Sequence, residues 1–81
     1  MNKVEQLEDE VRGVVGGILE VEPVHINGEA RLVQDLGMDS MMALEIIASL
    51  EKKYRIKLPE QELQNVTTLN RVVELTRRYV Q

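Results

Sequence analysis

The middle of the chain carries the stretch DLGMDSM, residues 35–41, followed by a largely apolar run that reaches Tyr54. Asp and Ser are favoured at the start of a helix, because their side-chain oxygens accept hydrogen bonds from first-turn N–H groups that have no other partner. Gly37 can adopt backbone angles closed to other residues and so sharpens the preceding turn. The stretch therefore predicts a helix that begins after Asp39 or Ser40.

This central helix carries two apolar stripes. The first consists of residues at helical spacing, namely Ala43, Ile46, Ile47, Leu50 and Tyr54. The second follows positions i, i+3 and i+7 and consists of Met41, Leu44 and Ala48. One core needs only one stripe of a helix, so the second is free for a partner or ligand unless neighbouring helices bury both. The sequence leaves these two arrangements open.

The segment before the central helix predicts one long helix and one long loop. Apolar residues at helical spacing indicate an amphipathic helix over about residues 3–20. Its three glycines each cost roughly 1 kcal/mol relative to alanine, so its last turn is expected to be irregular. Pro23 marks its end, and the connection to residue 39 is long for so small a domain. The loop residues able to pin it to the core are Leu32, Val33 and Leu36.

The segment after the central helix predicts two shorter elements. Pro59 suits the first turn of a helix, and residues 60–64 indicate one short helical turn. Thr67 or Thr68 then caps a final helix, whose inward residues are expected to be Leu69, Val72, Val73, Thr76 and Val80. No useful run of alternating apolar and polar residues is present, so the sequence predicts three main helices, one short helix and no strand.

Composition narrows the class of protein. The chain has 81 residues, no cysteine and a net charge of −4, with only two aromatic residues. This is enough for one small domain. An acidic chain with few aromatic rings is poorly suited to nucleic acid, and no apolar run is long enough to span a membrane. We expect a cytoplasmic monomer without membrane insertion or a metal site.

Ser40 has three possible roles on local chemistry alone. It can simply cap the helix, which is the commonest role of such a residue before an apolar run. A phosphate esterified to its hydroxyl would instead meet the positive end of the helix dipole and free N–H donors. A catalytic serine would need a neighbouring base, and the only histidine, His25, lies in the preceding loop. Spacing alone favours the cap.

From Leu32 to about Leu75 the sequence resembles the acyl carrier proteins. Besides the stretch 35–41, the resemblance rests on Leu44-Glu45-Ile46, Leu50-Glu51, Tyr54, Ile56, Leu58-Pro59 and Val66-Thr67-Thr68-Leu69. The core Leu-Gly-x-Asp-Ser is specific where it opens an apolar helix at mid-chain in an acidic protein of this length. The first helix matches only in pattern.

The resemblance implies an all-α, four-helix bundle with three main helices, one short helix and a long loop between the first two, filling residues 1–81 as a single carrier domain. It implies that a holo-carrier synthase, which is a phosphopantetheinyl transferase, moves 4′-phosphopantetheine from coenzyme A to Ser40, with Asp39 and Gly37 beside it. The arm would hold acyl groups as thioesters for acyl-transferring and ketosynthase-type enzymes. The chain would then be a carrier in fatty-acid, polyketide or modified-lipid biosynthesis, not an enzyme.

Two groups of residues follow from the same resemblance. Candidates for an acyl-chain pocket between the helices, which could equally be ordinary core, are Leu32, Leu36, Ile47, Leu50, Leu58, Val66 and Val72. Candidates for docking partner enzymes are Met41, Met42, Leu44, Glu45, Ala48 and Lys52.

The docking face departs from the pattern of carriers in primary fatty-acid synthesis. Met42 stands where those carriers commonly have Asp, and Lys52 and Lys53 replace expected acidic residues. Methionine suits an adaptable apolar contact, so we expect a specialised carrier with more apolar docking. Two alternatives stay open. A peptidyl carrier of nonribosomal peptide assembly is less favoured, since Met38-Asp39 precedes the serine, and a helical adaptor would carry no arm.

Overall fold

The computed structural model describes residues 3–80, with side chains from residue 6 to residue 80. Its three α-helices are α1 (Lys3–Leu19), α2 (Ser40–Tyr54) and α3 (Leu69–Tyr79). Two 3₁₀ helices lie between them, η1 (Pro23–His25) and η2 (Glu60–Asn65). Within residues 3–80 the only β-type pairing is an isolated bridge between Arg31 and Thr68. The all-α prediction of three main helices and a short one is therefore confirmed, with η1 as an additional turn in the long loop.

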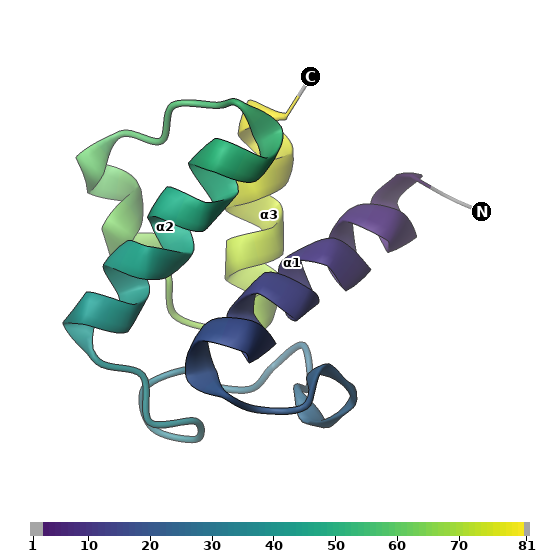
Figure 1. Ribbon diagram of the computed structural model, residues 1–81, viewed down its shortest axis with the longest axis vertical. Helices are drawn as coiled ribbons and strands as arrows, with labels where there is room; N and C mark the ends of the chain where they lie inside the picture. The colour runs from purple at the N-terminus through teal and green to yellow at the C-terminus, as the bar shows by residue number, and fades with distance from the viewer. Residues whose placement is uncertain (1–2, 81) are drawn as a thin grey trace.

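The helices form a bundle in which α1 packs on both α2 and α3 (Figure 1). η2 contacts both α2 and α3, and the long loop between α1 and α2 runs beneath one end of the bundle (Figure 1). No helix within residues 3–80 is long and apolar enough to cross a membrane. Ser40 lies at the end of α2 that the long loop leads into.

α1 stays helical through Leu19 despite its three glycines. It ends with Glu20 in the left-handed conformation (φ 59°), and the Val21 N–H donates to the Gly16 carbonyl at 2.9 Å. This six-to-one hydrogen bond is the Schellman ending of a helix. A Cβ on residue 16 would lie 2.6 Å from the Val21 carbonyl oxygen, so the crossing of the chain over α1 requires glycine there. The expected irregularity is thus confined to the residues after Leu19.

One core joins all the elements. Its fully buried apolar side chains come from the three helices and the long loop and are Val11, Val15, Leu32, Ile46, Leu50, Leu69, Val72 and Leu75. On α3 and at Val80, the residue that follows it, the buried positions differ slightly from those predicted. Leu75 is fully buried, whereas Val73 and Val80 are only half-buried. Thr76 is buried as expected, and its hydroxyl donates to the Val72 carbonyl at 2.7 Å, which satisfies this polar group inside the core.

Backbone hydrogen bonds fasten the long loop to the start of α3. The Leu32 N–H donates to the Thr67 carbonyl at 2.8 Å, and the Asn70 N–H donates to the Gly28 carbonyl at 2.9 Å. Leu32 is fully buried and Leu36 half-buried, so both anchor the loop as predicted. The prediction for Val33 was wrong, because this side chain is 54% exposed. The loop is therefore a packed part of the fold that ends at the first residue of α2.

Candidate functional site

Asp39, and not Ser40, caps α2. The Asp39 carboxylate accepts a hydrogen bond from the Met42 N–H at 2.8 Å, and the Asp39 carbonyl accepts one from the Ala43 N–H at 3.0 Å. Asp39 has extended backbone angles, whereas Ser40 is the first helical residue and is exposed. This arrangement rules out Ser40 as the helix cap and leaves its hydroxyl at the solvent-facing start of the helix.

The first turn of α2 offers donors beside this hydroxyl. Asp39 accepts hydrogen bonds from the N–H groups of Met42 and Ala43. The N–H groups of Ser40 and Met41 come before these two, and N–H groups at this position have no partner within a helix. Such amides, together with the positive end of the helix dipole, favour a negatively charged group. An exposed hydroxyl next to them fits the phosphate end of a phosphopantetheine arm, and Ser40 is the residue here that would hold it.

A tight turn delivers the chain to this position. Gly37 has a φ of +74°, and its N–H donates to the Val33 carbonyl at 3.1 Å. No atom lies within 4 Å of where a Cβ would stand on residue 37, so the backbone angle and not the space selects glycine. The following side chain, Met38, is buried, and its N–H donates to the Leu32 carbonyl at 2.9 Å. Ser40 therefore follows directly on a segment anchored in the core.

An ion pair closes the same turn from outside. The Asp35 carboxylate accepts hydrogen bonds from the Arg31 backbone N–H at 2.9 Å and from the Arg31 Nη2 at 3.0 Å, and the Asp35 N–H donates to the Arg31 carbonyl at 2.8 Å. These contacts hold the pKa of Asp35 below its ordinary value, chiefly through the side-chain hydrogen bond from Arg31. Both residues are exposed, so the pair fixes the shape of the turn more than it stabilises the fold.

The second apolar stripe of α2 is exposed. Met41 and Leu44 are 73% and 55% exposed, and Ala48 also lies in solvent. Of the two arrangements left open by the sequence, the structure therefore has the one in which this stripe is free. Glu45 and Lys52 are exposed on the same helix, whereas Met42 is half-buried and packs against the core. The expected docking residues thus share one open face, with Met42 at its edge.

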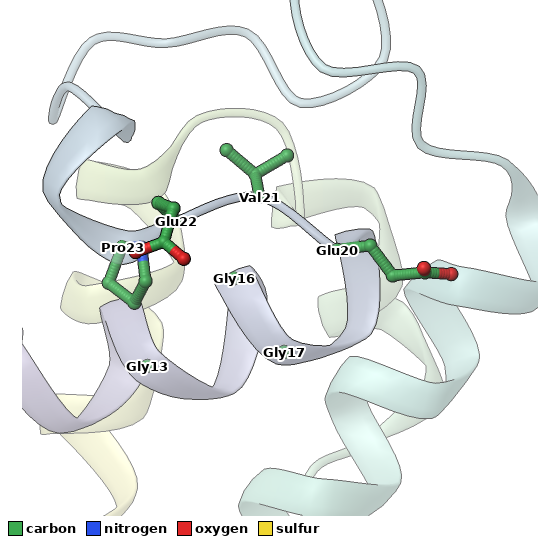
Figure 2. Close-up of a pocket in the computed structure, with 7 residues that line it drawn as sticks. All are labelled: Gly13, Gly16, Gly17, Glu20, Val21, Glu22 and Pro23. Carbon is green, nitrogen blue, oxygen red and sulfur yellow. The ribbon is translucent and has the colours of Figure 1, made fainter.

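The expected acyl-chain residues belong to the core. Leu36 and Ile47 are half-buried, and the other five are buried, namely Leu32, Leu50, Leu58, Val66 and Val72. The structure brings all seven together in one cluster. A hollow on the surface lies elsewhere, between α1 and residues 20–23 (Figure 2). None of the seven lines it.

Sequence patterns gave no signal for a polar contact that holds η2 against α3. Glu62 is nearly buried, and its carboxylate accepts hydrogen bonds from the Tyr79 hydroxyl at 2.7 Å and from the Asn65 amide at 2.9 Å. The Arg78 guanidinium lies 3.8 Å away. The hydrogen bond from Tyr79 is the largest cause of a lowered pKa at Glu62. A single glutamate in a short polar segment could not have been distinguished from an exposed one.

Comparisons with known proteins show the family of the chain. The family described as "Phosphopantetheine attachment site" matches residues 9–76. The chain is 37% identical over 68 residues to polyketide-8 synthase acyl carrier protein 2 of Streptomyces avermitilis, covering 84% of this chain and 78% of that protein. It is 34% identical over 73 residues to the acyl carrier protein of Wolinella succinogenes, covering 90% of this chain and 91% of that one.

A solved structure supports the fold. The solution structure of the apo doublet acyl carrier protein from prodigiosin biosynthesis superposes with a TM-score of 0.84 at 20% identity. The match covers 99% of this chain and 39% of that longer chain. Members of this family are carriers that bear a covalently attached 4′-phosphopantetheine and work with phosphopantetheinyl transferases and synthase enzymes. The chain therefore belongs to the phosphopantetheine attachment family, as an acyl carrier protein.

Proposed function

We propose that Ser40 is the attachment point of the phosphopantetheine arm and that residues 1–81 act as a single carrier domain. The observation that supports this most is the division of roles at the start of α2. Asp39 provides the capping hydrogen bond, so Ser40 is exposed at the first helical position beside first-turn N–H donors. The thiol of the arm would hold acyl intermediates of fatty-acid, polyketide or modified-lipid biosynthesis as thioesters.

The chain's own residues would serve this function by presentation. Gly37 and the buried Met38 fix the turn before Ser40, so the tethered group would leave the protein from a defined point. A tether also replaces free diffusion by a high local concentration at each partner enzyme. In this proposal a holo-carrier synthase modifies Ser40 in the cytoplasm, where coenzyme A is available, and acyl-transferring and ketosynthase-type enzymes then use the carrier.

The open face of α2 is proposed as the docking surface. Met41, Leu44 and Ala48 expose apolar area next to Ser40, with Glu45 and Lys52 on the same helix. Exposed apolar patches of this kind commonly mark protein contacts. We therefore propose a carrier dedicated to a specialised pathway. Turnover by general fatty-acid elongation enzymes as efficient as that of a standard fatty-acid carrier would contradict this part.

An acyl chain held inside the protein would have to enter the existing core. Leu32, Leu50 and Val72 are fully buried, so a bound chain must displace packed side chains before it gains about 0.8 kcal/mol per buried methylene. The half-buried residues Leu36 and Ile47 lie at the edge of the same cluster. The acyl chain is proposed to pass into the core between these two residues.

Intact mass spectrometry tests the attachment. The chain is incubated with coenzyme A and each of several phosphopantetheinyl transferases of different specificity. We expect addition of one phosphopantetheine, abolished in Ser40→Ala and kept in Ser49→Ala, which removes a hydroxyl farther along the same helix. Modification that persists in Ser40→Ala would refute the site, and no modification of the folded wild-type chain by any of the transferases would refute the function.

A further inference from the structure

A basic segment follows the docking face at the far end of α2. Four cationic residues fall within six positions, Lys52, Lys53, Arg55 and Lys57, in a chain whose net charge is −4. All four side chains are exposed. The ion pairs within the part of the chain that the structure describes are Arg12 with Glu8 and Asp9, Arg31 with Asp35, and Arg78 with Glu62, so none of them neutralises this segment.

The dipole of α2 accounts for only part of this charge. Lys52 and Lys53 lie in the last turn of the helix, where cations are favoured. Arg55 and Lys57 lie beyond the helix end, and Arg55 adopts a left-handed backbone (φ 55°) that glycine would adopt at lower cost. The Arg55 N–H and the Ile56 N–H already satisfy the Glu51 carbonyl. The fold therefore needs a helix stop at residue 55 but does not need a cation there.

The basic segment continues the exposed apolar stripe. Met41, Leu44, Ala48 and Lys52 follow positions i, i+3, i+7 and i+11 and lie on one face of α2, all of them exposed. Eleven residues of α-helix rise about 16 Å. One face thus runs from apolar side chains beside Ser40 to positive charge about 16 Å away, which is within the width of a standard protein interface.

We propose that the partner enzyme which receives this face of α2 carries an apolar contact beside the arm and an acidic patch that receives Lys52, Lys53, Arg55 and Lys57. This inference rests on the proposed docking function of α2 and names the charge of its partner. Charge complementarity mainly raises the association rate and excludes partners of like charge. The chain as a whole has a net charge of −4 and two aromatic residues, which opposes binding to nucleic acid and to a negatively charged membrane surface outside this one segment. Carriers of this family work with synthase enzymes, so a protein is the occupant.

A charge-swap experiment tests the inference directly. The probes are a ketosynthase whose carrier-binding face is basic and the same enzyme with those basic side chains changed to glutamate. The carrier variants are wild type, Lys52→Glu with Lys53→Glu, and a control with the same change in charge, Arg71→Glu with Arg77→Glu, on the exposed surface of α3. Binding of ¹⁵N-labelled carrier is followed by NMR titration, which gives a dissociation constant and the residues in contact without requiring the arm.

We expect the wild type to bind the glutamate-faced enzyme more tightly, by roughly three- to tenfold, since exposed charge pairs contribute about 0.2–1 kcal/mol each. Lys52→Glu with Lys53→Glu should reverse that preference, and the α3 control should keep it. The wild-type preference should also weaken as salt is added.

The inference would be overturned if the two double variants changed the preference between the two enzymes equally. It would also be overturned if the wild type bound both enzymes with the same dissociation constant. A further outcome would assign the segment to lipid and also overturn the inference. In it, the wild type binds vesicles rich in phosphatidylserine and the Lys52→Glu, Lys53→Glu variant does not, while the wild type shows no preference between the two enzymes. None of these readouts depends on modification of Ser40. Failure of arm attachment would therefore refute the proposed function separately.

Discussion

Replacement of Asp39 by alanine separates the cap of α2 from the rest of the site. The Asp39 carboxylate accepts the Met42 N–H at 2.8 Å, and both groups are close to solvent. Loss of an N-cap side chain costs about 1 kcal/mol, within a range of about 0.5–2. Loss of a negative charge at the positive end of the helix adds about 0.3–1 kcal/mol at low ionic strength. We therefore expect Asp39→Ala to be destabilised by about 1–2 kcal/mol.

Urea unfolding followed by circular dichroism measures this loss, and thermal unfolding should show a fall in Tm of about 4–8 °C per kcal/mol for a domain of this size. Asp39→Asn is the matched control. Asparagine caps helices as well as aspartate does, so this variant should lose only the charge contribution. The reasoning is refuted if Asp39→Ala is as stable as the wild type, or if Asp39→Asn loses as much as Asp39→Ala.

Three further predictions concern other parts of the fold. Gly17→Ala should stabilise the protein by up to about 1 kcal/mol, because a Cβ there meets no atom within 4 Å. Gly16→Ala should destabilise it, because its Cβ would lie 2.6 Å from the Val21 carbonyl oxygen. Urea unfolding of the two variants checks the sign of each effect. Arg55→Gly should raise stability by up to about 1 kcal/mol, because it removes the roughly 1–2 kcal/mol cost of a left-handed conformation at residue 55, less the roughly 0.4–1 kcal/mol that glycine adds to the entropy of the unfolded chain. A loss of stability in thermal unfolding would contradict the backbone argument. The pKa of Glu62 is lowered in the folded protein. Its contribution to the free energy of unfolding is therefore present above the pKa of an unfolded glutamate, about 4.3, and is lost as pH falls through the lower folded value. Glu62→Gln should flatten the acid side of a plot of stability against pH, and an unchanged slope would refute the contact between Glu62 and Tyr79.

The helices could be predicted because their signals are local. Apolar spacing, the capping residue types and Pro59 placed all three main helices and the short one to within a few residues. The end of α1 was harder to predict, because the glycines suggested a weakened helix. Its actual end depends on the contact between Gly16 and the Val21 carbonyl, which is a property of the folded chain and not of helix propensity.

The polar contacts could not be predicted for a related reason. Glu62 meets Tyr79 across 17 positions of the chain, and Tyr54 meets Glu10 across 44, with its hydroxyl 2.7 Å from the carboxylate. Burial and the hydrogen bond to Glu10 raise the pKa of Tyr54. Such pairs depend on how the helices are rotated against each other, and the apolar period determines that rotation only coarsely. The motif at residues 35–41 is different, because its turn, cap and helix start are all formed within a few residues.

The structure also explains why the local chemistry of Ser40 was ambiguous. Asp39 and Ser40 are both good capping residues, and one helix start can use only one of them as the cap. With Ser40 as the cap, its oxygen would be bound to a first-turn amide and α2 would begin one residue later. With Asp39 as the cap, the same amides are satisfied and the serine hydroxyl stays in solvent. The preceding turn places residue 39 at the cap position and residue 40 at the first helical position, so the order of the two residues itself leaves the hydroxyl available.

Exchange of these two residues tests whether their order matters. The double variant Asp39→Ser with Ser40→Asp keeps the composition of the chain and places a serine at the cap. Serine caps a helix about as well as aspartate does, so the stability of α2 should stay within a few tenths of a kcal/mol of the wild type. Arm attachment should be lost, because the hydroxyl at the cap would be bound to a first-turn amide and the first helical position would carry a carboxylate. Attachment at the wild-type rate, measured by intact mass, would show that the order does not matter.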